Sequence, residues 1–134
     1  MDRRVLIEDH VPSDIDYVGQ FLSNAMEKIR KHVIDEDLIF DIRLIIDELV
    51  VNGAQHGNEW NSSKKVFLKV DMDREKMMIS VRDEGIGMNY STDQFDCKEM
   101  KCSGRGLVIV EALTDVITYN GNQICCTKYL LNKR

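Results

Sequence analysis

The sequence has few of the features that mark fibrous, membrane-spanning or secreted chains. Its 134 residues include one proline and eight glycines, which argues against a collagen-like or linker-dominated architecture. Its longest apolar runs are a few residues long, far below the roughly 20 residues that cross a bilayer. No apolar signal region with a small-residue cleavage site opens the chain. We therefore expect no membrane partner and a cytoplasmic location.

Dense clusters of basic residues are also lacking. The chain has 18 Lys and Arg residues against 23 Asp and Glu residues, which gives a formal net charge of −5. Proteins that bind nucleic acid usually present a concentrated basic face. We therefore expect no nucleic-acid partner, and small molecules and other proteins are the better candidates.

Cysteines are few, and their spacing does not favour a metal site. The four are Cys97, Cys102, Cys125 and Cys126. No histidine lies close in sequence to the first two, and the adjacent pair would point to opposite faces of a strand. Zinc sites favour two paired clusters, and disulfides are rare in a reducing cytoplasm. We interpret the four cysteines as buried or incidental free thiols.

What the chain does have is a 43% hydrophobic fraction, enough to fill one core, in a regular pattern. Apolar residues at helical spacing predict a first helix from Ser13 or Asp14 to about Val33. A second helix is predicted from Asp35 to His56-Gly57, with Gly57 as a left-handed cap. Gly104-Arg105-Gly106 opens a third, at about 107–113. Strands are predicted at about 4–7, 65–71, 76–82, 115–120 and 123–131.

These elements predict a single domain over residues 1–134. Three helices and about five mostly hairpin-connected strands favour an α+β two-layer sandwich, with a mostly antiparallel mixed sheet covered on one face by the helices. At 100° per residue, the second helix has one continuous apolar stripe. Its polar residues Asp41, Glu48, Asn52 and Gln55 fall on the opposite side.

The first candidate site is the pair Glu48 and Asn52, whose side chains lie one helical turn apart on the same face. An amide oxygen is a hard ligand that suits Mg²⁺, which takes few protein ligands and completes its shell with phosphates and water. A carboxylate one turn away would orient a water or hydroxyl for attack on a γ-phosphate. A merely solvated helix face would show the same pattern.

The second candidate is Asp83-Glu84-Gly85-Ile86-Gly87, directly after a predicted strand. A carboxylate there would accept a hydrogen bond from the exocyclic amine of adenine, whereas guanine carries an oxygen at that position. The glycines permit close approach of the backbone to a flat base. An ordinary turn would use the same glycines.

The third candidate is Ser103-Gly104-Arg105-Gly106-Leu107 at the start of the last predicted helix. Glycines at a helix start expose amides to phosphate oxygens, and the helix dipole favours negative charge there. Lys101 and Arg105 would add positive charge against the phosphates. An ordinary loop-to-helix junction is the alternative.

In this order and spacing, the three segments resemble the motif boxes of the Bergerat-fold ATPases, the fold shared by gyrase B and sensor histidine kinases. The resemblance covers nearly the whole chain. The form Glu-x-x-x-Asn-x-x-x-His-Gly, which here runs from Glu48 to Gly57, and the short single-domain length are similar to the bacterial anti-sigma factor serine/threonine-protein kinases.

The resemblance implies that the protein binds ATP and Mg²⁺, with Asn52 as the magnesium ligand, Asp83 on adenine and Glu48 as the catalytic base. It implies a mobile lid at 88–103. It also implies an anti-anti-sigma (STAS-type) protein that is phosphorylated on serine, a sigma factor that is sequestered, and a homodimer. The implied nucleotide-binding residues are Asn52, Asp83, Gly85, Gly87, Lys101, Gly104, Arg105, Gly106, Leu107 and Thr127.

Two positions depart from the family pattern. Gly53 stands where these helices usually carry alanine, at a cost of about 1 kcal/mol in helix propensity. Cys126-Thr127 stands where a Gly-Thr pair is common. This departure weakens the expectation that Thr127 is a second contact on the adenine side.

Three other functions fit parts of the sequence. One is the catalytic domain of a histidine kinase separated from its dimerisation helices, although neither His10 nor His32 has the setting of a phospho-accepting histidine. Another is a nucleotide-gated binding module without turnover. The last is an α+β domain that binds no nucleotide.

Overall fold

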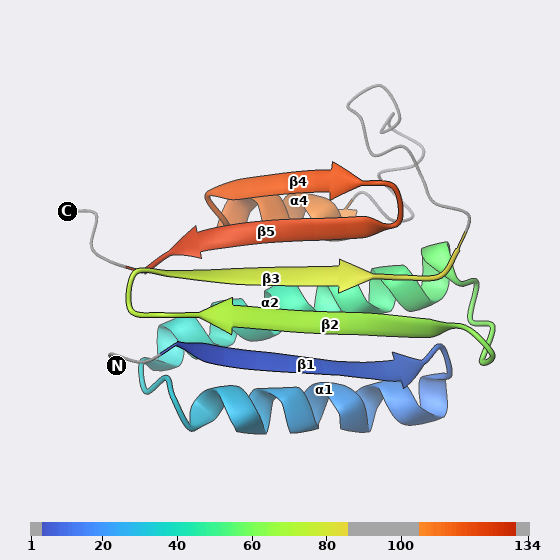
Figure 1. Ribbon diagram of the computed structural model, residues 1–134, viewed down its shortest axis with the longest axis horizontal. Helices are drawn as coiled ribbons and strands as arrows, with labels where there is room; N and C mark the ends of the chain where they lie inside the picture. The colour runs from blue at the N-terminus through green and yellow to red at the C-terminus, as the bar shows by residue number, and fades with distance from the viewer. Residues whose placement is uncertain (1–3, 86–104, 131–134) are drawn as a thin grey trace.

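The computed structural model describes residues 4–85 and 105–130, with the backbone alone at Arg105. These residues form one five-stranded sheet with its helices packed on a single face (Figure 1). No helix of the described ranges is long and apolar enough to cross a membrane. In chain order the elements are β1 (Val5–Pro12), α1 (Ile15–Arg30), α2 (Glu36–Asn52), the π-helical turn η1 (Gly53–Gly57), β2 (Lys65–Met72), β3 (Lys76–Arg82), α4 (Arg105–Leu113), β4 (Val116–Asn120) and β5 (Gln123–Tyr129).

The sheet runs in the order β1-β2-β3-β5-β4, and each pairing within the described chain is antiparallel. The α+β two-layer prediction is confirmed, and the sheet described is antiparallel rather than mixed. β1 is longer than the predicted 4–7, because its pairing with β2 continues to Pro12. The predicted tight hairpin joins β4 to β5, but its two turn residues are Gly121, at φ 64°, and Asn122, because Asn120 pairs with Gln123 in the ladder.

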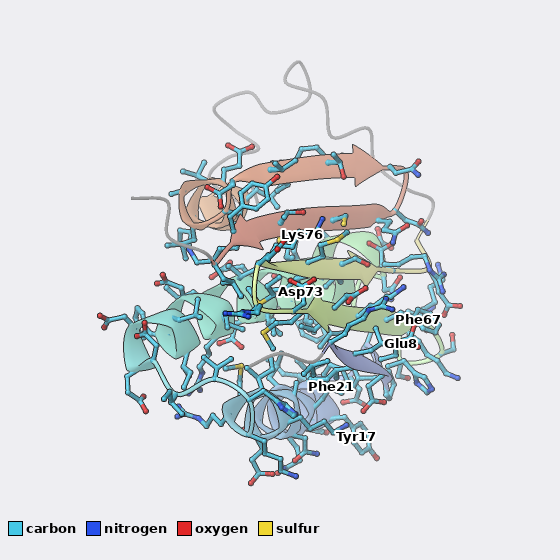
Figure 2. All side chains as sticks on the ribbon, turned by 60° about the vertical axis from the view of Figure 1, so that its left-hand side comes forward. Glu8, Tyr17, Phe21, Phe67, Asp73 and Lys76 are labelled. Atoms are coloured by element: carbon cyan, nitrogen blue, oxygen red, sulfur yellow. The ribbon has the colours of Figure 1, made fainter. Side chains whose placement is uncertain are left out.

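The turn between β2 and β3 lies where the sequence predicts it. Asp73 Oδ1 accepts hydrogen bonds from the backbone N–H groups of Glu75 at 2.8 Å and Lys76 at 3.0 Å. These bonds use the side chain of Asp73 to close the turn, the usual role of aspartate there. Figure 2 labels Asp73 and Lys76 together at this end of the hairpin.

Both long helices begin at an aspartate cap. Asp14 accepts from Asp16 N–H ahead of α1, and Asp35 accepts from two amides ahead of α2, which satisfies donors that have no partner in the helix. α1 ends at Arg30, earlier than predicted, yet Val33 is still only 9% exposed. The apolar side of the chain after α1 therefore packs on the core without helical structure.

The core lies between the helices and one face of the sheet. Phe21 of α1 is buried there, whereas Tyr17 is 59% exposed, and Figure 2 shows Tyr17 directed away from the sheet. In β2 and β3 the side chains alternate, so every second residue enters the core. The largest fully buried side chains are Ile29, Ile42, Ile45, Ile46, Leu49, Leu68, Met72, Met77 and Ile79.

The opposite face of the sheet has no covering layer among the described residues (Figure 1). Glu8, Phe67, Ser80 and Gln123 lie on it, around a shallow hollow of about 460 Å³. Arg82 stacks there on the Phe67 ring, with its guanidinium carbon 4.2 Å from the ring centroid. Figure 2 shows Glu8 and Phe67 on this side.

Candidate nucleotide-binding site

Asp83 lies just past the end of β3, on the face of the sheet that meets the helices. Met77, Ile79 and Val81 precede it at alternate positions and are buried, and Asp83 itself is only 5% exposed. Its Oδ1 accepts a hydrogen bond from Gly85 N–H at 2.9 Å. Within the described chain its Oδ2 accepts none. Because the side chain is nearly buried, a carboxylate oxygen that lacks a donor there is available to accept a hydrogen bond from a ligand N–H.

The turn after α2 packs directly on this carboxylate. A Cβ on Gly57 would collide with the carboxylate oxygens of Asp83, and a Cβ on Gly85 would collide with the carbonyl oxygen of Gly57. Both glycines are therefore required by close approach. This corrects the prediction for Gly57: it is the last residue of η1 and has no left-handed φ. Among residues 4–85 and 105–130, the non-glycine residues with positive φ are Glu59 and Trp60, at 55° each.

Gly53 is a different case. A Cβ built on it would lie 3.4 Å from Val66 Cγ1 and 3.6 Å from Asp83 Cβ, which is ordinary van der Waals contact. An alanine therefore fits at this position, and close approach does not demand the glycine. Gly53 also accepts the hydrogen bond of Asn58 N–H at 2.8 Å, five residues on, which widens the last turn of the helix into a π turn.

Glu48 lies on the flank of α2 that faces α4. A Cβ on Gly106, in the first turn of α4, would collide with Oε1 of Glu48. The carboxylate therefore lies beside the positive end of the α4 dipole. Glu48 and Asn52 are both partly buried. The sequence pattern predicts both on the polar side of α2, opposite its apolar stripe. Their partial burial follows from α4, which packs against α2.

A second acidic residue, Asp47, points elsewhere. Helical geometry turns it by about 100° from Glu48, and it pairs with Arg43 on the same helix at 3.6 Å. Its Oδ1 is buried without a hydrogen-bond partner in the described chain. Burial raises the pKa of Asp47 above its ordinary value, and Arg43 partly offsets that effect. Of the two adjacent acids, Glu48 is the one that meets α4.

Burial also raises the pKa of Asp83. The hydrogen bond from Gly85 and the charges of Lys64 and Arg82 act in the opposite direction but are the smaller effects. An ionised carboxylate at this place is therefore less stable than in water and gains from any donor that reaches it. The exocyclic amine of adenine is such a donor.

Of the remaining predicted site residues, the structure describes some and not others. Gly87, Lys101 and Gly104 lie outside the described residues, as does the predicted lid at 88–103. Arg105 and Gly106 open α4, and Leu107 is 4% exposed in the core. The structure thus brings Glu48, Asn52, Asp83, Gly85 and Gly106 to one end of the helical layer, between α2, the end of β3 and the start of α4.

Thr127 is not brought to these residues. In β5 the residues Ile124 and Cys126 are buried toward the helices, and Lys128 reaches Asp41 of α2 at 3.8 Å. Alternation directs Thr127 to the open face, opposite to Asp83. It pairs with Met78, five residues before Asp83 in β3. The residue of β5 that faces the helical layer at this point is Cys126.

Cys125 and Cys126 are free thiols. Burial raises the pKa of Cys126 to about 12, so the thiol stays protonated at neutral pH and reacts slowly. Within the described residues no group of three or more His, Cys, Asp or Glu side chains is placed to hold a metal ion. Cys97 and Cys102 lie outside those residues.

Two asparagines at the site were missed by the sequence analysis. Asn58 is 1% exposed and bonds to three separate segments, and Asn122 bonds to the backbone of Asp83 on both sides. Both stand next to glycine, in positions that are typical of polar turn residues. No signal in one sequence separates a buried asparagine from an exposed one at such a place.

A two-layer α/β fold with a buried strand-end aspartate, glycine contacts and a polar flank on α2 is the arrangement expected of a nucleotide-binding ATPase domain. The model of the family described as "Histidine kinase-like ATPase domain" matches residues 11–128. The chain therefore belongs to the histidine kinase-like ATPase family, as the resemblance predicted.

Curated relatives narrow the comparison. The chain is 32% identical to a protein named anti-sigma F factor from Bacillus velezensis, over 70% of this chain and 71% of that protein. It is also 32% identical to anti-sigma F factors from Bacillus thuringiensis and Bacillus anthracis, over 69% of this chain and 70% of each. Within the family, it is thus a relative of the anti-sigma F factors.

Proposed function

We propose that this protein is an ATP-dependent protein-serine kinase that acts as an anti-sigma regulatory factor. In this proposal it phosphorylates a STAS-type anti-anti-sigma partner on serine and sequesters a sigma factor. The observation that carries the proposal is the Asp83 carboxylate, which is 5% exposed and has one oxygen that lacks a donor in the described chain. It lies near α2, where Glu48 meets the start of α4 and Asn52 follows one helical turn later. The kinship with anti-sigma F factors supports the regulatory part.

Each residue has a part that its placement supports. Asp83 would accept a hydrogen bond from the exocyclic amine of adenine, and Gly57 and Gly85 leave room for the carboxylate and its turn. Asn52 would supply an amide oxygen to Mg²⁺, and the metal would neutralise phosphate charge. The amides at the start of α4 would bind phosphate oxygens, and Gly104, Arg105 and Lys101 are proposed to assist there. We further propose a cytoplasmic location, a single domain and a homodimer.

Glu48 is proposed as the general base. It accepts the proton of the serine hydroxyl while the serine oxygen forms a bond to the γ-phosphorus and the bond to the ADP oxygen breaks. The Glu48 carboxylate is partly buried beside the start of α4, where a serine hydroxyl and the γ-phosphate are proposed to meet. Positioning and charge stabilisation then supply most of the rate.

Phosphoryl transfer from γ-labelled ATP to a candidate STAS-type partner tests the proposal. Glu48→Gln should lower the transfer rate by about 100-fold or more, with little change in ATP affinity. Asp47→Asn is the matched control, because it changes the neighbouring acid on the other flank, and it should keep the wild-type rate. Equal rates for Glu48→Gln and wild type would remove Glu48 as the base.

The same assay separates the other functions. Phosphate on the partner that is labile in acid and stable in base would indicate a histidine kinase activity. Tight ATP binding with no transfer over hours would indicate a nucleotide-gated binding module.

A further inference from the structure

Two asparagines hold the turn that carries Asp83, and they come from opposite sides of it. Asn58 follows η1, and Asn122 lies in the turn between β4 and β5. The Nδ2 group of each asparagine donates to another part of the protein, so we assign neither a direct contact with the nucleotide. What they fix is the backbone of the turn that begins at Asp83.

Asn58 acts from the helical side. Its Oδ1 accepts the hydrogen bond of Glu84 N–H at 2.8 Å. Its Nδ2 donates to Ser13 Oγ at 2.7 Å and to Lys65 O at 3.0 Å. Asn58 is 1% exposed. A side-chain amide is stable in such a buried place only when its N–H and C=O groups have hydrogen-bond partners. Asn58 therefore fixes Glu84 to the start of α1 and to the start of β2.

Asn122 acts from the hairpin side. Its Nδ2 donates to Asp83 O at 2.6 Å, and its own carbonyl oxygen accepts from Asp83 N–H at 3.0 Å. This pair of bonds extends the β3–β5 ladder by one position past Arg82 and Gln123. The main-chain groups of Asp83 are thereby fixed on both sides of its Cα.

The Asp83 side chain itself has little else to hold it. Within the described chain its carboxylate accepts one hydrogen bond, from Gly85 in the same turn. Gly57 and Gly85 limit the space around it by contact but donate no bond to its Oδ2. The direction of Oδ2 therefore follows from the position of the backbone at 83 and 84, which the two asparagines determine.

We propose that Asn58 and Asn122 are positioning residues for base recognition, which act through Asp83 to set its carboxylate for the adenine amine. The inference rests on the proposed nucleotide site. It assigns to the asparagines the specificity for adenine over guanine, in addition to a share of the stability. A merely structural role would lower stability without changing how the folded protein ranks nucleotides.

Calorimetric titration with Mg-ATP and Mg-GTP, well below the unfolding temperature, tests this on Asn58→Ala and Asn122→Ala. Each substitution removes one or more hydrogen bonds that place Asp83, so ATP affinity should fall by about tenfold. GTP affinity should change by less than about threefold, so the preference for ATP narrows. Asn61→Ala and Asn120→Ala are matched controls, since Asn61 bonds within its own exposed loop to Ser63 and Asn120 lies exposed in β4.

A double-mutant cycle with Asp83→Asn shows whether the asparagines act through Asp83. In the Asp83→Asn background, either alanine substitution should weaken ATP binding by less than about threefold. Full multiplicative losses in the cycle would overturn the proposal, as would ATP and GTP affinities of the single variants within twofold of wild type.

Failure of the proposed function has a different signature. A wild-type protein that binds no ATP overturns both proposals, whereas wild-type binding with unchanged variants overturns the positioning role alone. Asn122 is only partly buried, so Asn122→Ala keeps the test decisive if Asn58→Ala does not fold.

Discussion

Asp83 combines a binding role with a cost in stability. Its pKa is raised in the folded protein, chiefly by burial. A raised pKa means that the folded state holds the proton more tightly than the unfolded state. The resulting stabilisation is present below the unfolded pKa, about 4 for aspartate, and is lost as the pH rises through the folded pKa. At neutral pH the ionised carboxylate is thus a burden on the free protein.

Asp83→Asn should therefore unfold at the same or a higher temperature than wild type at pH 7 without nucleotide. Its advantage should shrink as the pH falls toward about 4, where the wild-type carboxyl takes up its proton. The same variant should show a smaller thermal shift with Mg-ATP, because its weaker acceptor lowers ATP affinity. Scanning calorimetry over this pH range, with and without nucleotide, measures both. A variant that keeps the full ATP shift would contradict the role of Asp83.

Gly53 and Gly57 lie in the same turn, but alanine substitutions at the two positions should have opposite effects on stability. Gly57→Ala places a Cβ against the Asp83 carboxylate and should destabilise the protein by about 1–3 kcal/mol, with loss of ATP binding. Gly53→Ala has room for its methyl group and should be neutral or stabilising by up to about 1 kcal/mol. Urea unfolding measures the two free energies. Equal effects would show that helix propensity, rather than the Asp83 contact, governs the turn.

Among the elements, the predictable ones were those with a local cause. Period and caps predicted α1 and α2, and the Asn-Gly step predicted the β4–β5 turn, because each depends on residues a few positions apart. The order β1-β2-β3-β5-β4 was not predicted, since pairing partners distant in sequence leave no such local mark. The second half of β1 was not predicted either, because Glu8, Asp9 and His10 form a polar run. Such a run is compatible with an edge strand that has one uncovered face.

The site shows the same division. Motif spacing predicted that Glu48, Asn52, Asp83 and Gly106 would lie in one site. In the structure they lie on α2, just after β3 and in the first turn of α4, and these elements are packed together. Motif spacing did not predict the π turn, which is closed by the hydrogen bond from Asn58 N–H to the Gly53 carbonyl oxygen. Nor did it predict that Thr127 lies on the other face, which depends on the phase of β5 relative to its partners.

The junction of α4 with α2 gives a prediction about catalysis. Gly106→Ala places a methyl group against Oε1 of Glu48, the mobile end of a side chain that can move at low cost. Stability should therefore change by less than about 1 kcal/mol, while phosphoryl transfer falls by about tenfold or more because the base is displaced. Parallel transfer and unfolding assays test this. Gly19→Ala in α1, where a Cβ meets open space, is the control and should keep the wild-type rate.

Across the whole molecule, the site joins segments that no local interaction would hold together. The turn after α2, the end of β3, the β4–β5 turn and the start of α4 all contribute groups around Asp83 and Glu48. The hydrogen bond from Asn58 to Ser13 adds the β1–α1 junction. A ligand that contacts several of these segments favours the folded state as a whole, and its binding therefore appears as global stabilisation.

Mg-ATP at 100 times its Kd should thus add about 2.7 kcal/mol of stability. For a chain of 134 residues, this corresponds to a rise of roughly 10 °C in Tm. ADP should also raise Tm, because it carries the adenine that Asp83 reads, whereas GTP at the same concentration should act much less. The ordering of the three nucleotides matters more than the size of any one shift, since charge alone would rank ATP and GTP equally. Equal shifts by ATP and GTP would contradict recognition of the base by Asp83, and no shift with any nucleotide would contradict the nucleotide site itself.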